Sequence, residues 1–365
     1  MTESNLSFGG LEGMDNSKPK DLSDDELTYY SRQFILDEIG YVGQLRLKGS
    51  TATIVGLGGL GTPAATQLAA MGVGHLRVID RDVVSMSNLH RQHLYTAADV
   101  GYPKVEVAAK RLEAMNPHID VEPIPWSVHK DSVEDFIRDA DVVVDGLDNL
   151  SARFLVNRAC QKHGVPYVFA GAIQTYGSIS TLVPGETPCL ECFYSGMNDE
   201  DLPKCAVVGV HPALLGVISN IEVSEAVHII TGKEPNLAGK LAYFDISNLS
   251  YDSVDIRKAS SCPVCGEEPS GELQPVEYHE VEELCGRGGR RTFVVQPLER
   301  QKLNLNDIKT QALDRNFEML VEGDLGVTFK IPLTGIVSVL ESGIIIYVGA
   351  DDKTQVRNFY DVFLE

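Results

Sequence analysis

The sequence predicts an α/β protein with a doubly wound parallel sheet, followed by a small C-terminal α+β domain. Between residues 51 and 170, short β-branched runs alternate with segments that carry apolar residues at helical spacing. Such alternation is typical of parallel strands joined by right-handed helical crossovers. A polar stretch rich in proline and glycine, residues 266–275, then separates this region from further apolar runs.

The first domain begins with a helix and continues as alternating strands and helices. Ser23 and Glu26 have the spacing of a capping box, which predicts a helix from there to about Glu38. The following elements are predicted from apolar periodicity and from the positions of glycine and proline. They are strand 51–55, helix 59–71, strand 75–79, helix 103–115, strand 119–124, helix 132–138, strand 141–144, helix 152–163, strands 165–170 and 178–183, helix 213–230 and strand 240–245.

The predicted domain organisation has three parts. Residues 1–22 form a flexible leader, 23–267 the first domain, and 268–365 a small domain of a size that can fold alone. Apolar runs in the last part lie at 292–296, 327–331 and 343–349, and the chain ends in a hairpin followed by a helix over 352–363.

The composition excludes several classes of function. The 365 residues are 43% hydrophobic and 23% charged, which is typical of a globular protein. With 31 basic and 52 acidic residues the net charge is −21, which argues against nucleic acid or anionic lipid as the main partner. We find neither an uninterrupted apolar stretch of the ~18 residues that span a bilayer nor a signal-peptide core, so we expect a cytoplasmic protein with no membrane partner.

Two Cys-x-x-Cys pairs stand out among the seven cysteines, Cys189 with Cys192 and Cys262 with Cys265. Each pair can bind one tetrahedral zinc ion from two sides, so we predict a structural zinc site that joins distant segments. Two unrelated turns, or a redox pair of the thioredoxin kind, are the alternatives; neither pair opens a helix after the first strand of a βαβ unit. Cys160, Cys205 and Cys285 remain outside this set.

A glycine-rich turn follows the first predicted strand and indicates a nucleotide site. Its glycines are Gly56, Gly58, Gly59 and Gly61, and Asp80 and Asp82 follow the next strand. Glycines let the backbone approach phosphate or sugar, the helix start favours anions, and an acid after the second strand can accept hydrogen bonds from ribose hydroxyls. Tight packing of the turn is the structural alternative.

The residues after this turn favour a triphosphate over a nicotinamide dinucleotide. Lys104 lies at the start of a helix, where the macrodipole disfavours a cation, which indicates a bound anion nearby. Together with Arg91 it supplies the cations that charge-assisted contacts to β- and γ-phosphates require. The alternative for Lys104 is a solvated surface lysine.

Asp148 follows the apolar strand 141–144 at the edge of the sheet where doubly wound folds bind ligands. A lone carboxylate there suits a Mg²⁺ ion that keeps most of its water and bridges phosphates. The alternative for Asp148 is to cap the next helix, which Asn149 or Ser151 could do instead.

Taken together, these motifs resemble those of the E1-like adenylating enzymes, which include the molybdopterin-synthase and thiamine-thiocarboxylate adenylyltransferases and the activating enzymes of ubiquitin-like proteins. The resemblance covers about residues 22–267 and implies a Rossmann-like adenylation domain, ATP, Mg²⁺, a bound zinc ion and a homodimer. It rests on Ser31-Arg32-Gln33, Gly56-Leu-Gly-Gly-Leu-Gly61, Asp80-Arg-Asp82, Ser87-Asn-Leu-His-Arg-Gln92, Gly101-Tyr-Pro-Lys104, Asp145-Gly-Leu-Asp-Asn149 and both cysteine pairs.

The resemblance also implies a role for individual residues. Asp80 would hold the ribose, Asp148 the catalytic Mg²⁺, and Arg32 would reach the ATP of the neighbouring protomer. The triphosphate would be held by Asn88, Arg91, Gln92 and Lys104, with Asp82 and Asn149 in the same ATP site. The implied reaction is attack by the C-terminal glycine carboxylate of a ubiquitin-like or sulfur-carrier β-grasp protein on the α-phosphate, releasing pyrophosphate.

Cys205 matches the position at which several relatives carry a reactive cysteine, and Lys204 beside it would lower the pKa of the thiol. A thioester or acyl-persulfide on Cys205 could then pass to an E2-like conjugating enzyme or a sulfur donor. The alternatives are a packed loop cysteine and an adenylyltransferase for molybdopterin, thiamine or tRNA thiolation that forms no thioester. An NAD-dependent oxidoreductase and a catalytically silent scaffold are more distant alternatives.

The C-terminal part departs from the resemblance. Cys285-Gly-Arg-Gly-Gly-Arg290 superficially resembles the active loop of a rhodanese domain, which many relatives carry at this end. The surrounding segment lacks the strand and helix order of a rhodanese, and Cys285 comes too early in the domain. We therefore expect a small partner-recruiting domain, by analogy with the ubiquitin-fold domains of ubiquitin-activating enzymes.

Overall fold

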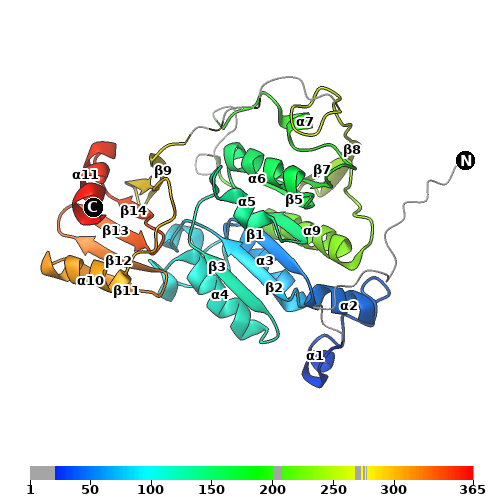
Figure 1. Ribbon diagram of the computed structural model, residues 1–365, viewed down its shortest axis with the longest axis horizontal. Coiled ribbons are helices and arrows are strands. Elements are labelled where there is room, and N and C mark those ends of the chain that lie inside the picture. Colours follow the sequence, from blue (N-terminus) through cyan, green and yellow to red (C-terminus); the bar gives the residue numbers. More distant parts are fainter. Residues whose placement is uncertain (1–20, 200–207, 268–272, 274–275, 277, 365) are drawn as a thin grey trace, which may run out of the picture.

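The computed structural model describes residues 21–199, 208–267, 273, 276 and 278–364. Its strands form two sheets, a larger one in the first two thirds of the chain and a smaller one in the last third (Figure 1). The strand order is β3-β2-β1-β4-β5-β6-β7-β8 in the first sheet and β11-β12-β13-β14-β10-β9 in the second. This architecture confirms the predicted fold class, while the boundary at residue 267 remains a prediction because the chain just after it lies outside the described residues.

The first sheet is parallel in one half and antiparallel in the other. Strands β1 to β5 pair in parallel, as predicted, whereas β6, β7 and β8 pair antiparallel. The direction changes between β5 and β6 because only two residues join them, and one of these, Gln174, has a φ of 51°. The strands are β1 (Thr51–Val55), β2 (His75–Ile79), β3 (Asp120–Ile124), β4 (Val142–Asp145), β5 (Tyr167–Ile173), β6 (Tyr176–Leu182), β7 (Lys240–Asp245) and β8 (Ser250–Asp255).

Helices cover both faces of this sheet. On one face α2 (Gly40–Lys48), α3 (Gly61–Met71), α4 (Lys104–Met115) and α9 (Pro212–Thr231) share one buried apolar cluster with the strands. On the other face α5 (Val133–Ile137) and α6 (Leu150–His163) belong to a second cluster. The described chain has one helix, α9, that is long and apolar enough to cross a membrane, but half of it is buried against β4, β5, β6 and its neighbouring helices.

The second sheet is antiparallel throughout and has two buried faces. Its strands are β9 (Val281–Arg287), β10 (Arg290–Val295), β11 (Glu318–Glu322), β12 (Gly326–Ile331), β13 (Gly335–Leu340) and β14 (Ile345–Val348). Helices α10 (Leu305–Asp314) and α11 (Lys353–Leu364) pack on one face with Phe293, Val295 and Tyr347. The predicted hairpin and final helix are confirmed by β13, β14 and α11.

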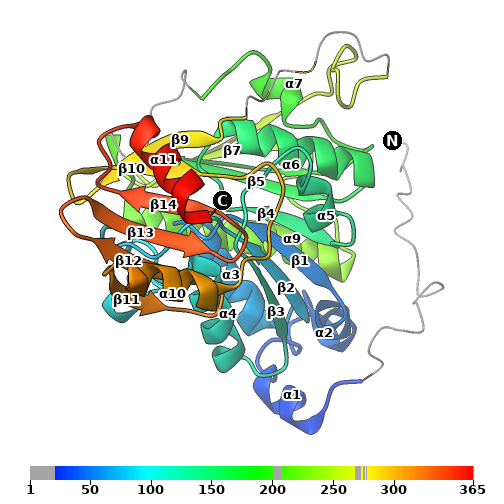
Figure 2. The ribbon, with the colours of Figure 1, turned by 60° about the vertical axis from the view of Figure 1, so that its left-hand side comes forward.

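The opposite face of the second sheet packs against the first sheet. Val294 and Ile346 alternate with the residues that face α10 and α11, and they join the buried cluster that contains Ile124 and Trp126. Figures 1 and 2 show the second sheet lying beside the part of the first sheet that contains β2 and β3. The C-terminal unit therefore covers apolar surface that α5 and α6 leave uncovered.

The prediction of one helix up to Glu38 is wrong. The capping box of Ser23 and Glu26 is present, but α1 (Asp24–Tyr29) ends at once, and turns lead to α2. Tertiary contacts hold this segment: the Tyr30 hydroxyl accepts a hydrogen bond from Asn116, and the Gln33 amide donates to the Met71 carbonyl. These contacts with α3 and α4 outweigh the local helical pattern.

Candidate functional site

Three loops meet at the carboxyl edge of the parallel strands. Val55, the last residue of β1, lies opposite Ile79 of β2 and Asp145 of β4. The glycine-rich turn after β1 is therefore flanked by the loop that begins at Asp80 and by the loop that contains Asp148. The sequence predicted ligand residues in all three loops, and the register brings them to one place.

The glycine-rich turn has no room for side chains at two positions. A Cβ added to Gly61 would lie 1.8 Å from the Gly56 carbonyl oxygen. Gly56 itself has a φ of 92°, and its Cβ would lie 2.5 Å from the carbonyl oxygen of Gly146 in the neighbouring loop. The turn thus packs backbone against backbone and opens directly into α3, whose first residue is Gly61.

Asp80 holds this turn from the next strand. One carboxylate oxygen accepts a hydrogen bond from the Leu57 amide at 2.7 Å, and the other accepts one from the Asp82 amide at 2.7 Å. Each oxygen retains a lone pair for a further donor. Its predicted role as a ribose acceptor is compatible with this geometry and remains a prediction.

Lys104 lies in a buried cluster of charges. Its Nζ is 3.1 Å from a carboxylate oxygen of Asp82 and 3.9 Å from one of Asp80, and its side chain is only 7% exposed. The alternative of a solvated surface lysine is therefore wrong. Burial lowers the pKa of Lys104, but Asp80 and Asp82 outweigh that effect and raise it. The anionic groups inferred from its position at the start of α4 thus include two carboxylates of the chain itself.

Asp82 is also bound by the second sheet, which the sequence did not predict. The guanidinium of Arg287, the last residue of β9, donates to its carboxylate, and Arg81 and Glu282 form a second ion pair between the sheets at 2.8 Å. Burial raises the pKa of Asp82, but the charges of Arg287 and Lys104 outweigh it and hold the pKa well below its usual range. In the sequence, Arg287 belongs to the glycine-rich motif Cys285-Gly-Arg-Gly-Gly-Arg290, which superficially resembles a rhodanese loop.

Two predicted triphosphate residues have buried amide oxygens without partners. Among the described residues, neither Asn88 Oδ1 nor Gln92 Oε1 has a hydrogen-bond partner. Buried polar atoms are nearly always satisfied, so these amides indicate a group that the described residues do not supply. Arg91, on the same segment, donates to the Ser87 carbonyl at 2.9 Å.

Asp148 is exposed in the loop after β4 and does not cap the next helix. Asn149 is the N-cap of α6, with its side chain accepting a hydrogen bond from the Ala152 amide at 2.8 Å. Asp199, which the sequence analysis missed, accepts further hydrogen bonds from the Leu150 and Ser151 amides. The capping alternative for Asp148 is wrong, and its carboxylate remains accessible to a metal ion.

A buried arginine supports the loop that carries Asp148. Arg153 donates to the Asp145 carboxylate at 2.9 Å and to the carbonyls of Leu147 and Ala170 at 2.6 and 2.7 Å. The hydroxyl of Tyr167 donates to the same carboxylate at 2.6 Å. These contacts hold the backbone between β4 and α6 in place.

The structure does not test the predicted roles of two further site residues, Arg32 and Cys205. Arg32 is exposed between α1 and α2, and no hydrogen bond or ion pair joins it to the described pocket residues. Its predicted role in a neighbouring protomer is not tested by a single chain. Cys205 lies outside the described residues, so its predicted role also remains a prediction.

The four paired cysteines meet at one point. Their sulfur atoms all lie within 4.8 Å of one another, with 3.6 Å between Cys189 and Cys262 and 3.4 Å between Cys192 and Cys265. Tetrahedral zinc with Zn–S distances of about 2.3 Å needs sulfur atoms at about this spacing. The donor set therefore fits a structural zinc ion that joins α7 (Glu191–Tyr194) to the segment after β8.

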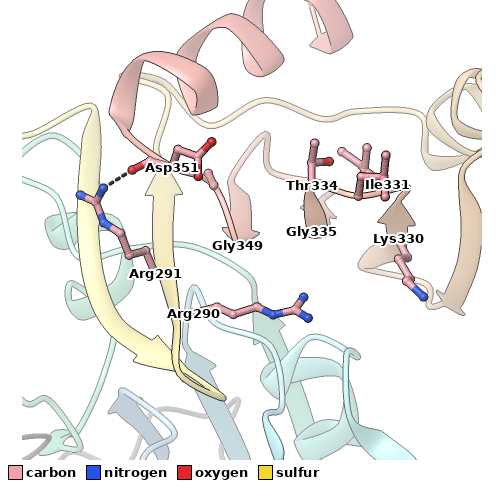
Figure 3. Close-up of a pocket in the computed structure, with 10 residues that line it drawn as sticks. Arg290, Arg291, Lys330, Ile331, Thr334, Gly335, Gly349 and Asp351 are labelled. Atoms are coloured by element: carbon pink, nitrogen blue, oxygen red, sulfur yellow. Dashed lines mark hydrogen bonds between the residues drawn. The ribbon is translucent and has the colours of Figure 1, made fainter.

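A separate hollow of about 430 Å³ lies at the second sheet, and no residue of the three loops lines it. Figure 3 shows Arg290, Arg291 and Lys330 around it, with Arg291 bonded to the Asp351 carbonyl. Arg291 also pairs with Glu283 at 2.7 Å, so part of this positive charge is already neutralised.

Comparison with known proteins agrees with this geometry. A sequence profile of the ThiF family matches residues 30–264, well over half of the chain. The chain belongs to the ThiF family. The region matched by the ThiF profile contains the three loops of the pocket, whereas Arg287 lies beyond its end.

Named relatives cover most of the same region. The SAMP-activating enzyme E1 of Haloferax volcanii is 39% identical over 256 residues, which are 70% of this chain and 94% of that protein. The sulfur carrier protein adenylyltransferase of Thermus thermophilus is 39% identical over 268 residues, 72% of this chain and 97% of that protein. The crystal structure of Escherichia coli MccB with MccA-N7isoASN has a TM-score of 0.59 at 25% identity and covers 66% of this chain and 75% of that one. The resemblance to E1-like adenylating enzymes is confirmed.

Proposed function

We propose that this ThiF-family chain uses ATP and Mg²⁺ to adenylate the C-terminal carboxylate of a ubiquitin-like or sulfur-carrier protein of the β-grasp fold. The observation that carries the proposal is the convergence of the glycine-rich turn, Lys104, Asp148 and two unpartnered buried amides at one edge of the sheet. The relatives named as activating enzyme and adenylyltransferase support this function.

The predicted nucleotide residues differ in the part of the nucleotide that each can bind. The tight turn at Gly56 and Gly61 lets a ribose or phosphate approach the backbone, and Gly58 and Gly59 lie between them. Asp80 can accept from ribose hydroxyls, while Lys104 and Arg91 can bind phosphate oxygens. The amide groups of Asn88 and Gln92 can donate to the same oxygens, because an amide can turn its nitrogen toward an acceptor.

The chemistry needs little from a general base. A carboxylate oxygen of the carrier protein forms a bond to the α-phosphorus, and the bond from that phosphorus to the bridging oxygen breaks, with pyrophosphate leaving with the electron pair. The attacking carboxylate is already ionised near neutral pH, so no proton has to be removed. The chain then acts by positioning and by neutralising phosphate charge.

Asp148 is the residue that would hold Mg²⁺. Its exposed carboxylate, the adjacent Asn149 and the phosphates could share an ion that keeps several waters. Such an ion, when bound, neutralises charge on the phosphates. The hydrogen bonds of Arg153 to Asp145 and Leu147 would keep the loop that carries Asp148 in place.

Several finer points remain predictions within this proposal. They are the homodimer with Arg32 reaching its neighbour's ATP, the cytoplasmic location, a thioester or acyl-persulfide on Cys205, and a partner-recruiting role for the C-terminal unit. An adenylyltransferase for molybdopterin, thiamine or tRNA thiolation without a thioester is the alternative within the same reaction. Family membership favours either over a nicotinamide oxidoreductase or a silent scaffold.

ATP–pyrophosphate exchange with purified β-grasp proteins tests the proposal. We expect exchange only when a carrier with an intact C-terminal glycine is present, and its loss in Asp148→Ala, which should fold normally because the side chain is exposed. Undiminished exchange in Asp148→Ala would contradict the assigned metal site. A non-reducing gel of wild type and Cys205→Ser then tests for a covalent adduct that depends on the thiol.

A further inference from the structure

The second sheet contributes a charged side chain to the predicted nucleotide pocket. Arg287 reaches Asp82 from a position 205 residues further along the chain, and the side chains are only 15% and 20% exposed. The pair is therefore largely shielded from water, where an ion pair between charged groups is stronger than at the surface. Asp82 lies inside the region matched by the ThiF profile, whereas Arg287 lies beyond its end.

Contacts on both sides of Lys104 hold the second sheet at this place. The Thr328 hydroxyl donates to the Gly101 carbonyl at 2.7 Å, and the Leu325 amide donates to the Glu106 carboxylate at 2.9 Å. Gly288 and Gly289, both with positive φ, turn the chain directly after Arg287 into β10. The guanidinium is thus presented by the β9–β10 hairpin of a sheet whose strand β12 is hydrogen-bonded to the segment around the start of α4.

The charge balance of the cluster depends on this arginine. Without it, Lys104 would be the one cation among the described residues that pairs with the carboxylates of Asp80 and Asp82, at 3.9 and 3.1 Å. Arg81 cannot replace it without giving up its own partner, Glu282. A lysine that is held by two carboxylates has little attraction left for phosphate, whereas with Arg287 present the two anions face two cations.

We propose that Arg287 is a positioning residue of the nucleotide site: it neutralises Asp82 and thereby leaves Lys104 free to bind the phosphates of the nucleotide. The proposal rests on the proposed function, because it assumes that a nucleotide triphosphate binds between the three loops. It also makes the C-terminal unit part of that site.

Direct titration of the full chain with Mg·ATP and with adenosine tests this role. For Arg287→Ala we expect about tenfold weaker ATP binding, since the charge-assisted interaction of Lys104 with the phosphates is lost. Adenosine has no phosphates, so its binding should be unchanged. Arg287→Lys should restore part of the ATP affinity. Arg291→Ala, an arginine on the next strand that pairs with Glu283 and Asp351, is the matched control and should bind ATP like wild type.

A double-mutant cycle then asks whether Arg287 acts through Asp82. In an Asp82→Asn background, Arg287→Ala should change ATP affinity less than twofold, because no carboxylate remains there to compete for Lys104. A full tenfold loss in that background, equal or tighter ATP binding by Arg287→Ala, or an equal loss of adenosine binding would each overturn the proposal. Failure of the wild type to bind ATP would instead overturn the proposed function on which it rests.

Discussion

Gly61 shows how strictly the nucleotide loop depends on a single missing side chain. Its Cβ would lie 1.8 Å from the Gly56 carbonyl, so Gly61→Ala must displace the backbone of the turn. We expect a loss of about 3 kcal/mol in the free energy of unfolding, measured by urea denaturation, together with lost ATP binding.

Gly216 is the matched control for this substitution. It lies within α9 with nothing within 4 Å of an added Cβ, so Gly216→Ala should stabilise the chain by about 0.5–1 kcal/mol through helix propensity. If the two alanine variants were equally stable, the close approach of the backbone at Gly61 would be disproved.

The ion pairs of Asp82 should make stability depend on pH. Its folded-state pKa is depressed, so the stabilisation is fully present above the unfolded value of about 3.9 and is lost as the pH falls through that range toward the folded-state pKa. Asp82→Asn should cost about 3 kcal/mol at pH 7, because Arg287 loses its charged partner, and the difference from wild type should shrink below about pH 4.

Urea denaturation at several pH values measures this difference. Glu318→Gln serves as the control, because its pair with Lys330 is exposed and at 3.7 Å should contribute less than about 1 kcal/mol. A constant difference for Asp82→Asn across the acidic range would show that the pKa of this carboxylate is not lowered in the folded chain.

At the scale of elements, the four-cysteine cluster joins the segment at α7 to the segment after β8, and its cysteines lie outside the strands of the sheet. We expect about one zinc ion per chain in the purified protein, since the sulfur atoms are already gathered within 4.8 Å. Cys262→Ser should lose the metal and lower the Tm by about 5 °C or more, which corresponds to a few kcal/mol for a chain of this size.

Cys160 provides the control for the zinc site. It is buried in α6 away from the cluster, so Cys160→Ala should retain the full zinc content. Metal analysis and thermal unfolding of the two variants measure the effect. Purified wild type without zinc, and with the same Tm after zinc is added, would rule out a structural metal.

Elements with strong periodicity were predictable from the sequence, and those defined by tertiary contacts were not. β1 and β2 have the predicted bounds because β-branched runs end at glycine or aspartate. By contrast, β8 was missed because all six of its residues are exposed and only its pairing with β7 makes it a strand. The short α2 was also missed, because two of its nine residues are glycines and its place is set by packing against α9.

At the scale of the whole molecule, the candidate site also combines features that local sequence patterns predict with features that only tertiary contacts define. Asp80, Asp148 and Lys104 were predictable because each occupies a defined position relative to a strand or helix end. The pairing of Arg287 with Asp82 was not, because it depends on where the second sheet docks. Because of this docking, deleting residues 268–365 would remove more than a separate domain. It would uncover part of a buried apolar cluster and remove Arg287 from the pocket.

The single tryptophan of the chain reports on this docking. Trp126 is 1% exposed and belongs to the buried cluster that the first sheet shares with Leu340 and Ile344 of the second unit. The Ser342 hydroxyl donates to the carbonyl of the adjacent Pro125 at 2.6 Å, which ties the two units at this point. Because the units share a core, we expect urea unfolding followed by Trp126 fluorescence to coincide with unfolding followed by far-UV circular dichroism.

Substitutions in the second unit extend this test. Ile344→Ala should lower both midpoints together and cost about 2–5 kcal/mol, because it leaves a cavity in the shared core. Leu298→Ala, on the same unit but 65% exposed, should change stability by less than about 0.5 kcal/mol. A fluorescence change that precedes the loss of secondary structure would mean that the C-terminal unit separates first. Arg287 would then be withdrawn from Asp82 before the adenylation fold unfolds.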